Sequence, residues 1–145
     1  MNQIMVIYWS QTGNTEMMAN AVAEGIREAG ADCKLAQVAS VSAELLREAP
    51  VFALGCPAMG GEVLEEDEME PFMEAVEPLI QGRQIGLFGS YGWGDGQWMR
   101  DWEERVQGAG AIVAGGQGVM AQETPDEDAL NQCRELGKAL AALQV

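Results

Sequence analysis

The stretch Ser10-Gln11-Thr12-Gly13-Asn14-Thr15 decides the fold of this chain. It follows an apolar run at residues 4–9 and precedes Met18, Val22 and Ile26, which recur at helical spacing. We therefore predict a buried strand that leads through a short turn into a helix. Backbone N–H groups and the helix dipole at such a turn favour an anion, and three hydroxyl side chains add donors. A turn of this composition is also an ordinary helix cap, so the loop alone leaves both interpretations open.

The length and composition indicate one domain over residues 1–145. Of these residues, 48% are hydrophobic, which is enough for a sizeable core. No apolar run approaches the roughly 18 residues that a membrane span needs, and the N-terminal residues are typical of a strand, not of a signal peptide. The three cysteines form no C-x-x-C pair, which favours reduced thiols in the cytoplasm.

The charge and the missing histidines exclude several functions. Eight basic residues against 23 acidic ones give a formal net charge of −15, which argues against nucleic acid as a partner. The same charge suits a soluble protein that meets positively charged partners, but a surface that is acidic only for solubility would look alike. The absence of histidine removes the usual zinc sites and any Ser-His or Cys-His catalytic pair.

Apolar runs and helical patterns alternate along the rest of the chain. Further strands are expected at residues 33–38, 51–55 and 84–89, and a fifth at 111–121 that Gly115 and Gly116 interrupt. Alternation of this kind predicts an α/β fold, a three-layer doubly wound sandwich whose five-stranded parallel sheet has helices on both faces.

The expected helices have clear start and stop signals. The first ends at residue 28 or 29 before Gly30, and a brief one follows Ser42. Pro71 begins the next helix, and Asp95 caps one that carries Trp98 and Trp102 into the core. The last begins with a capping box at residues 124–127 and has one apolar face, formed by Leu130, Cys133, Leu136, Leu140 and Leu143.

Three unusual loops open at the same edge of this sheet, where folds of this kind bind ligands. They follow the first, third and fourth strands, at residues 10–15, 56–62 and 90–96. The second and third loops are rich in glycine and carry Met59, Tyr91 and Trp93, which could sandwich a flat ring. The alternative for Trp93 is a surface aromatic that folds back on its own loop.

A phosphate at one end and a ring at the other describe a mononucleotide cofactor. None of the three loops contains Lys or Arg, so nothing obvious handles a triphosphate. The motifs G-x-x-x-x-G-K-[ST] and, after the first strand, G-x-G-x-x-G are also absent.

Two stretches are highly specific: Tyr8-Trp9-Ser10-Gln11-Thr12-Gly13-Asn14-Thr15-Glu16 and Gly89-Ser90-Tyr91-Gly92-Trp93-Gly94-Asp95-Gly96. Gly55-Cys56-Pro57-Ala58-Met59-Gly60, Glu62 and Pro71-Phe72 add to them. Through these residues the whole chain resembles the flavodoxins, and more closely the short-chain group without an insertion in the fifth strand. The resemblance implies the sheet order 2-1-3-4-5, non-covalently bound FMN, and a low-potential electron carrier that is not an enzyme and shuttles between semiquinone and hydroquinone.

The resemblance also assigns roles to residues. It places the phosphate on Ser10, Gln11, Thr12, Gly13, Asn14 and Thr15, and the isoalloxazine between Met59 and Trp93. Glu62 would accept a hydrogen bond from flavin N3–H, and the carbonyl of Gly60 would turn toward N5–H after reduction. Residues 92–95 would hold the pyrimidine edge. The remaining cofactor-binding residues are Pro57, Ala58, Ser90, Tyr91, Gly92, Gly94 and Asp95, whereas Gln122 and Glu123 match too weakly to be assigned.

One position departs from the family pattern. Gly61 stands where Asp, Ser or Asn is common, and the third residue of a type II turn needs a positive φ. We predict that the reduced-state turn forms here at low strain. The same glycine loosens the unliganded loop, so its effect on the potential has no sign that we can derive.

Acidic residues near the expected flavin favour a low potential because they disfavour an anionic reduced flavin. They are Glu62, Asp95 and the cluster at residues 65–68. The cluster either steers the flavin edge toward redox partners with basic docking patches, such as reductases and ferredoxin-dependent type enzymes, or is a solvated loop. We expect a cytoplasmic monomer.

Two other functions fit the sequence less well. An FMN-dependent enzyme such as a quinone reductase needs a second pocket beside the flavin, and this short chain leaves few residues for one. A phosphorylated receiver domain needs an acidic cluster after the first strand and a later lysine. Here Tyr8-Trp9-Ser10 stands at the end of the first strand, and the only lysines are Lys34 and Lys138. We therefore reject a receiver domain.

Overall fold

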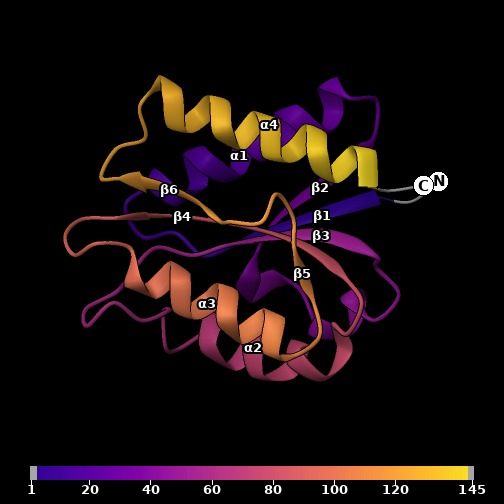
Figure 1. Ribbon diagram of the computed structural model, residues 1–145, viewed down its shortest axis with the longest axis horizontal. Coiled ribbons are helices and arrows are strands. Elements are labelled where there is room, and N and C mark those ends of the chain that lie inside the picture. The colour runs from indigo at the N-terminus through magenta and orange to yellow at the C-terminus, as the bar shows by residue number, and fades with distance from the viewer. Residues whose placement is uncertain (1–2, 144–145) are drawn as a thin grey trace.

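A parallel sheet forms the middle layer of the computed structural model, which describes residues 3–143 (Figure 1). The strands run in the order β2-β1-β3-β4-β5, and β6 also pairs with β4. Their bounds are β1 (Gln3–Tyr8), β2 (Asp32–Gln37), β3 (Val51–Gly55), β4 (Gln84–Tyr91), β5 (Ile112–Val113) and β6 (Val119–Gln122). The predicted α/β fold and sheet order are confirmed.

The fifth strand is divided, as its glycines predict. β5 pairs with the start of β4, where Gln84 lies opposite Ile112, and β6 pairs with its end, where Tyr91 lies opposite Gln122. Between them Gly115 and Gly116 have φ values of 78° and 84°, which favour glycine. The pairing with β6 extends β4 two residues beyond the predicted end.

The helices cover both faces of the sheet, with α1 and α4 on one side and α2 and α3 on the other (Figure 1). Their bounds are α1 (Asn14–Glu28), α2 (Met69–Val76), α3 (Gln97–Gly108) and α4 (Glu127–Leu143). Short 3-10 turns lie at η1 (Val38–Ser40), η2 (Ala43–Leu46) and η3 (Glu77–Leu79). Ser42 caps η2 as predicted, because its hydroxyl accepts from the N–H of Glu44. None of the described helices has both the length and the apolar character to cross a membrane.

Each face of the sheet has its own apolar core. Alternate residues of β1 supply both, since Ile4 and Val6 pack in the core with α1 and α4, while Met5 and Ile7 pack in the core with α2 and α3. Trp98 and Trp102 belong to the second of these cores and are each 1% exposed, so the prediction that they are core residues is confirmed.

The start of α2 corrects the sequence prediction. The helix begins at Met69, two residues before Pro71. The carboxylate of Glu65 explains the early start, because it accepts hydrogen bonds from the N–H groups of Asp67, Glu68 and Met69 at 2.8, 2.7 and 2.9 Å. Pro71 still lies within the first turn, where backbone N–H groups have no intrahelical acceptor, so its missing N–H costs the helix no hydrogen bond.

The start of α3 differs from the prediction too. Asp95 does not cap it, because Gly96, at φ 90°, takes the N-cap position. The side chain of Asp95 instead pairs with Arg100 at 3.1 Å, and its carbonyl accepts a second bond from the same guanidinium. This pairing fastens the third loop to the first turn of α3.

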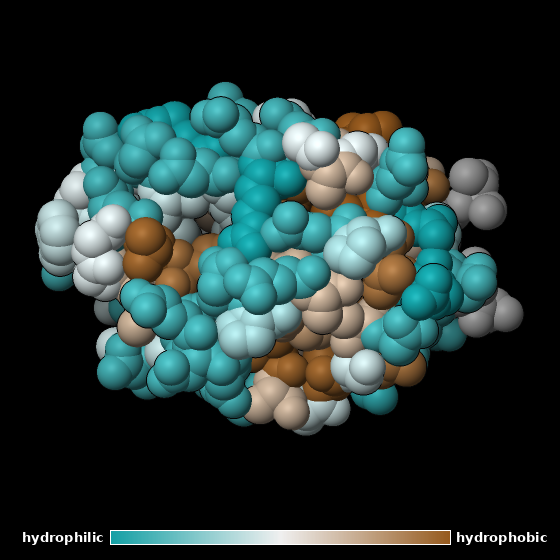
Figure 2. All heavy atoms as spheres, turned by 90° about the horizontal axis from the view of Figure 1, so that it is seen from below, coloured by the Kyte–Doolittle hydropathy of each residue, from teal (hydrophilic) through white to brown (hydrophobic). Residues whose placement is uncertain are grey.

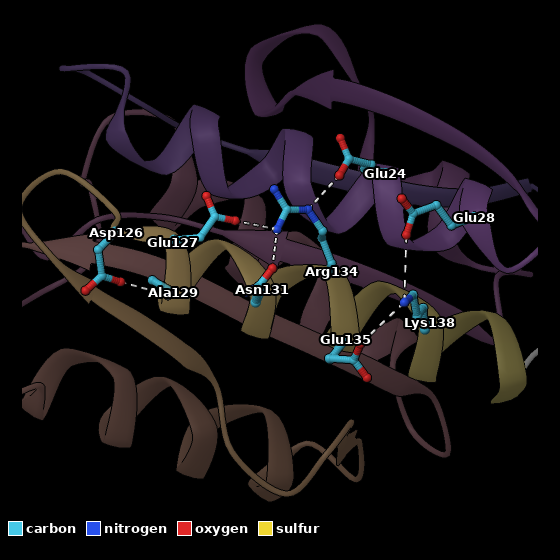
Figure 3. Close-up of polar contacts among 9 residues, drawn as sticks. All are labelled: Glu24, Glu28, Asp126, Glu127, Ala129, Asn131, Arg134, Glu135 and Lys138. Carbon is cyan, nitrogen blue, oxygen red and sulfur yellow. Dashed lines mark hydrogen bonds and ion pairs between the residues drawn. The ribbon is translucent and has the colours of Figure 1, made fainter.

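The last helix begins two residues later than a capping box at residues 124–127 requires. Asp126, not Thr124, is the cap, since its carboxylate accepts from the N–H of Ala129 at 2.8 Å (Figure 3). Pro125 consequently lies just outside the helix. The predicted apolar face is also displaced, because Leu143 is 38% exposed and Leu130 is only partly buried, while Ala129 and Gly137 are buried.

Small residues let α1 and α4 lie against each other. A Cβ atom at Gly25 would collide with the backbone carbonyl of Arg134, and one at Gly137 would collide with that of Val22. Around this contact, Arg134 pairs with Glu24 at 2.6 Å and with Glu127 at 3.1 Å (Figure 3). The two helices are thus joined by backbone contact inside and by ion pairs outside.

Candidate cofactor site

The three predicted loops meet at one cavity of about 390 Å³, at the carboxyl ends of the strands. From the predicted site it is lined by Ser10, Gln11, Thr12, Asn14, Thr15, Pro57, Ala58, Met59, Ser90, Tyr91 and Gly92. Glu123, which matched the family too weakly to be assigned, and Thr124, which was not singled out, also line it. Their position directly after β6 was the available signal. The other predicted site residues, Gly13, Gly60, Glu62, Trp93, Gly94 and Asp95, do not line this cavity.

The first loop forms the start of α1, and its own hydroxyls accept hydrogen bonds from the N–H groups there. Gly13, at φ 95°, is the N-cap of α1. The hydroxyl of Ser10 accepts from the N–H groups of Gly13 and Glu16 at 3.2 and 3.3 Å, and that of Thr12 accepts from Asn14 at 3.5 Å. An anion bound at this helix start would accept hydrogen bonds from the same N–H groups. The helix-cap and phosphate interpretations therefore describe one and the same loop.

A buried hydroxyl pair connects this loop to the end of β4. The oxygens of Thr15 and Ser90 lie 3.0 Å apart, and the Ser90 N–H also donates to Thr15 at 3.4 Å. Both side chains are almost fully buried, at 1% and 5% exposure. The first and third loops are thereby held in a fixed relation.

The second loop is held through its backbone, by one bond to the third loop and one from a side chain of α3. Ala58 donates to the carbonyl of Ser90 at 2.9 Å, and the indole N–H of Trp98 donates to the carbonyl of Cys56 at 3.1 Å. Met59, which follows, is partly buried, whereas Trp93 on the third loop is 68% exposed. Trp93 is thus mostly exposed and lies outside the lining of the cavity.

A tight turn closes the second loop. Glu62 donates its N–H to the carbonyl of Met59 at 2.9 Å, and Gly61 has φ 79° while Gly60 has no positive φ. A positive φ at the third residue alone is the signature of a type II turn. Glycine at position 61 thus meets the requirement that we derived from the sequence.

The carboxylate of Glu62 faces the start of α3. It accepts from the N–H of Gln97 at 3.1 Å, and a Cβ atom at Gly94 would lie 2.6 Å from its carboxyl carbon. Glu62 itself has φ 53°, which is uncommon for a residue other than glycine. A side chain at residue 94 would therefore displace the Glu62 carboxylate from this position.

Burial raises the pKa of all three cysteine thiols. Burial raises the pKa of the Cys56 and Cys133 thiols to about 12, so both are protonated at neutral pH. Burial likewise raises the pKa of Cys33, to about 11. Within residues 3–143, no group of three or more cysteine or carboxylate side chains is arranged to hold a metal ion.

Comparison with known proteins identifies the family. The sequence profile of the flavodoxins matches residues 6–137. The chain belongs to the flavodoxin family. It is 49% identical to a flavodoxin of Clostridium beijerinckii over 136 residues, which covers 94% of this chain and 97% of the relative. A flavodoxin of Megasphaera elsdenii is 42% identical over 138 residues, covering 95% and 98%.

The fold agrees with that assignment. The solution structure of two-electron reduced Megasphaera elsdenii flavodoxin is 41% identical and superposes with a TM-score of 0.85, covering 96% of this chain and 98% of the other. Flavodoxins bind FMN, and this flavodoxin is accordingly an FMN-containing, low-potential electron carrier and not an enzyme. The residues present fit that cofactor, since the cavity offers neutral hydroxyl and N–H donors at a helix start and flat ring surface beyond them.

Proposed function

We propose that the cavity described above is the FMN site and that the loops divide the cofactor among them. Ser10, Gln11, Thr12, Gly13, Asn14 and Thr15 bind the phosphate. Met59 and Trp93 flank the isoalloxazine, and residues 92–95 hold its pyrimidine edge. Pro57, Ala58, Ser90 and Tyr91 line the space between these ends. FMN supplies the one-electron chemistry when bound.

The turn at the second loop is proposed to respond to reduction. Its Met59–Glu62 hydrogen bond at 2.9 Å supports a carbonyl of Gly60 that faces flavin N5–H, and Glu62 accepts from N3–H. Because the Glu62 carboxylate is already oriented by Gln97, it needs little further ordering when the cofactor binds.

The acidic surface is proposed to set both the potential and the choice of partner. With a net charge of −15, the protein disfavours further negative charge on the flavin and attracts redox proteins that have basic docking patches. Hydrophilic side chains cover much of the α2 and α3 face, with apolar side chains in smaller patches between them (Figure 2). We place this single domain of residues 1–145 in the cytoplasm, as a monomer that serves reductases and ferredoxin-dependent type enzymes.

The observation that carries the proposal is the convergence of three loops on one cavity, which has no Lys or Arg among the described residues that line it. The test compares FMN with riboflavin, which lacks the phosphate. Thr12→Val removes one hydroxyl without changing the side chain's shape, so it is expected to weaken FMN binding about three- to tenfold and leave riboflavin binding unchanged. Equal effects on both ligands would contradict the phosphate assignment.

The partner proposal has a separate test. The rate of electron transfer to a basic redox protein is measured as ionic strength increases. Steering by the acidic surface predicts a rate that falls steeply with added salt, because exposed charges are screened within about 10 Å at 0.1 M. A flat dependence would overturn it.

A further inference from the structure

Glu16 stands in the first turn of α1, at the position from which a glutamate side chain can cap a helix. Gly13 is the N-cap of α1, so Glu16 is the third helical residue, whose carboxylate reaches back to the N-cap N–H in a capping box. The helix dipole would also stabilise a negative charge there. A carboxylate so placed would accept from the same N–H groups as a bound phosphate, and the two would compete.

The carboxylate of Glu16 is bound elsewhere in this structure. The hydroxyl of Tyr8 donates to it at 2.9 Å, and the N–H of Gly13 donates instead to the hydroxyl of Ser10 at 3.2 Å. The backbone of Glu16 still takes part in the helix start, since its N–H donates to the same Ser10 hydroxyl at 3.3 Å. Only the side chain of Glu16 is therefore diverted from the start of α1, and Tyr8 is the group that holds it.

Tyr8 is well fixed as a donor. It is the last residue of β1, and its side chain is 5% exposed in the core with α1 and α4. Burial raises the pKa of Tyr8, and the hydrogen bond to Glu16 raises it further, so the hydroxyl keeps its proton at neutral pH. Within residues 3–143, the carboxylate of Glu16 joins none of the ion pairs, so no basic side chain holds it in place of Tyr8.

A competing carboxylate matters at this helix start because the neighbouring cavity is poor in positive charge. The described residues that line it include no Lys or Arg, so backbone N–H groups and hydroxyls must bind a phosphate there. We propose that Tyr8 is a positioning residue, which keeps the carboxylate of Glu16 off the start of α1 and so leaves the anion site open. This inference rests on the proposed placement of the FMN phosphate in the first loop.

The experiment compares the dissociation constants of FMN and of riboflavin, which lacks the phosphate. Tyr8→Phe removes the hydroxyl and leaves the ring in the core. The freed carboxylate of Glu16 should turn to the helix start, so that FMN binding weakens about three- to tenfold while riboflavin binding is unchanged. Unchanged riboflavin binding also shows that the variant folds. The double variant Tyr8→Phe/Glu16→Gln lacks the competing charge and should bind FMN within about twofold of the original protein.

Glu28→Gln provides a matched control for that restoration. It makes the same change in net charge, but at the last residue of α1, about 20 Å from the helix start. Exposed charges are screened beyond about 10 Å at 0.1 M salt. The double variant Tyr8→Phe/Glu28→Gln should therefore bind FMN as weakly as Tyr8→Phe alone.

Three outcomes would overturn the proposal. If Tyr8→Phe weakens FMN and riboflavin equally, the hydroxyl supports the loop as a whole and not the anion site. If Tyr8→Phe leaves FMN binding unchanged, the bond to Glu16 has no part in the affinity. If Glu16→Gln does not restore FMN binding, or Glu28→Gln restores it as well, the carboxylate of Glu16 is not the competitor. Failure of the phosphate site itself shows separately, as an original protein that does not prefer FMN to riboflavin.

Discussion

The carboxylate of Glu62 accepts a hydrogen bond from the backbone N–H of Gln97 at 3.1 Å, and so joins the second loop to the first turn of α3. A Cβ atom at Gly94 would lie 2.6 Å from the carboxyl carbon of Glu62. A negative charge at a helix N-terminus is stabilised by the helix dipole. The charge of Glu62 is thus held in place before any cofactor contacts it.

Replacing Glu62 by Gln should raise the potential for the most reduced state of the flavin. A charge even as far away as about 10 Å in an effective dielectric of about 20 contributes roughly 1–2 kcal/mol, or about 40–90 mV for one electron, so a carboxylate that contacts N3–H should contribute at least that much. Spectroelectrochemical titration measures the shift. Glu66→Gln, an exposed carboxylate, serves as the control and should shift the potential less because salt screens it. Equal shifts in the two variants would contradict a specific role for Glu62.

Gly60 and Gly61 should respond differently to alanine, although a Cβ atom at either position meets no atom within 4 Å. Only Gly61 has a positive φ, at 79°, so Gly61→Ala strains the turn by about 1–2 kcal/mol and Gly60→Ala does not. If the reduced protein depends on this turn, Gly61→Ala lowers the potential of that step by about 40–90 mV. A potential that moves as much in Gly60→Ala would show that the turn geometry is not the cause.

The contact between α1 and α4 should tolerate no side chain at Gly25. Alanine there would push the two helices apart, because its Cβ would occupy the space of the Arg134 carbonyl. We expect a loss of about 1–3 kcal/mol or more in the free energy of unfolding, measured in urea. Gly108→Ala is the matched control, since its Cβ has open space at the end of α3 and should leave stability unchanged or raise it by about 0.5–1 kcal/mol. Similar losses in both variants would contradict the argument.

Local patterns predicted the sheet, because the apolar period and the glycines that end or break a strand are properties of adjacent residues. They also predicted the three loops, since parallel strands bring their carboxyl ends to one edge. Local patterns did not predict where α2, α3 and α4 begin. In the acidic stretch before α2, nothing local indicates that Glu65 turns inward while Glu66 stays in solvent.

The missed parts of the site depend on distant neighbours. Glu123 lines the cavity because β6 pairs with the end of β4, and that pairing fixes its backbone on Tyr91. The buried face of α4 likewise depends on how closely α1 approaches. Gly25 and Gly137 allow backbone contact, which buries Ala129 and leaves the larger Leu143 at the rim.

Glu65 should make the stability of the protein depend on pH in the acid range. Its side chain is 6% exposed. Burial alone would raise the pKa of this carboxyl, but the three N–H donors at the start of α2 outweigh it and hold the pKa below its ordinary value. A carboxyl with a lowered pKa stabilises the fold above its unfolded pKa of about 4.3, and that contribution is lost as the pH falls through the folded pKa.

Glu65→Gln should therefore cost about 1–3 kcal/mol of unfolding free energy at pH 7 and progressively less below about pH 4. In the native protein one carboxylate oxygen accepts from the N–H of Asp67, and the other accepts from those of Glu68 and Met69. Glutamine keeps only one acceptor oxygen. Its NH₂ group would therefore face the N–H donor or donors that the other oxygen accepts in the native protein. Urea unfolding at several pH values gives the difference between the two proteins. Glu66→Gln changes an exposed neighbour and should show a small difference at every pH. A cost for Glu65→Gln that stays constant down to pH values near 3 would mean that the neutral side chain packs poorly, and that the charge of Glu65 contributes nothing to the start of α2.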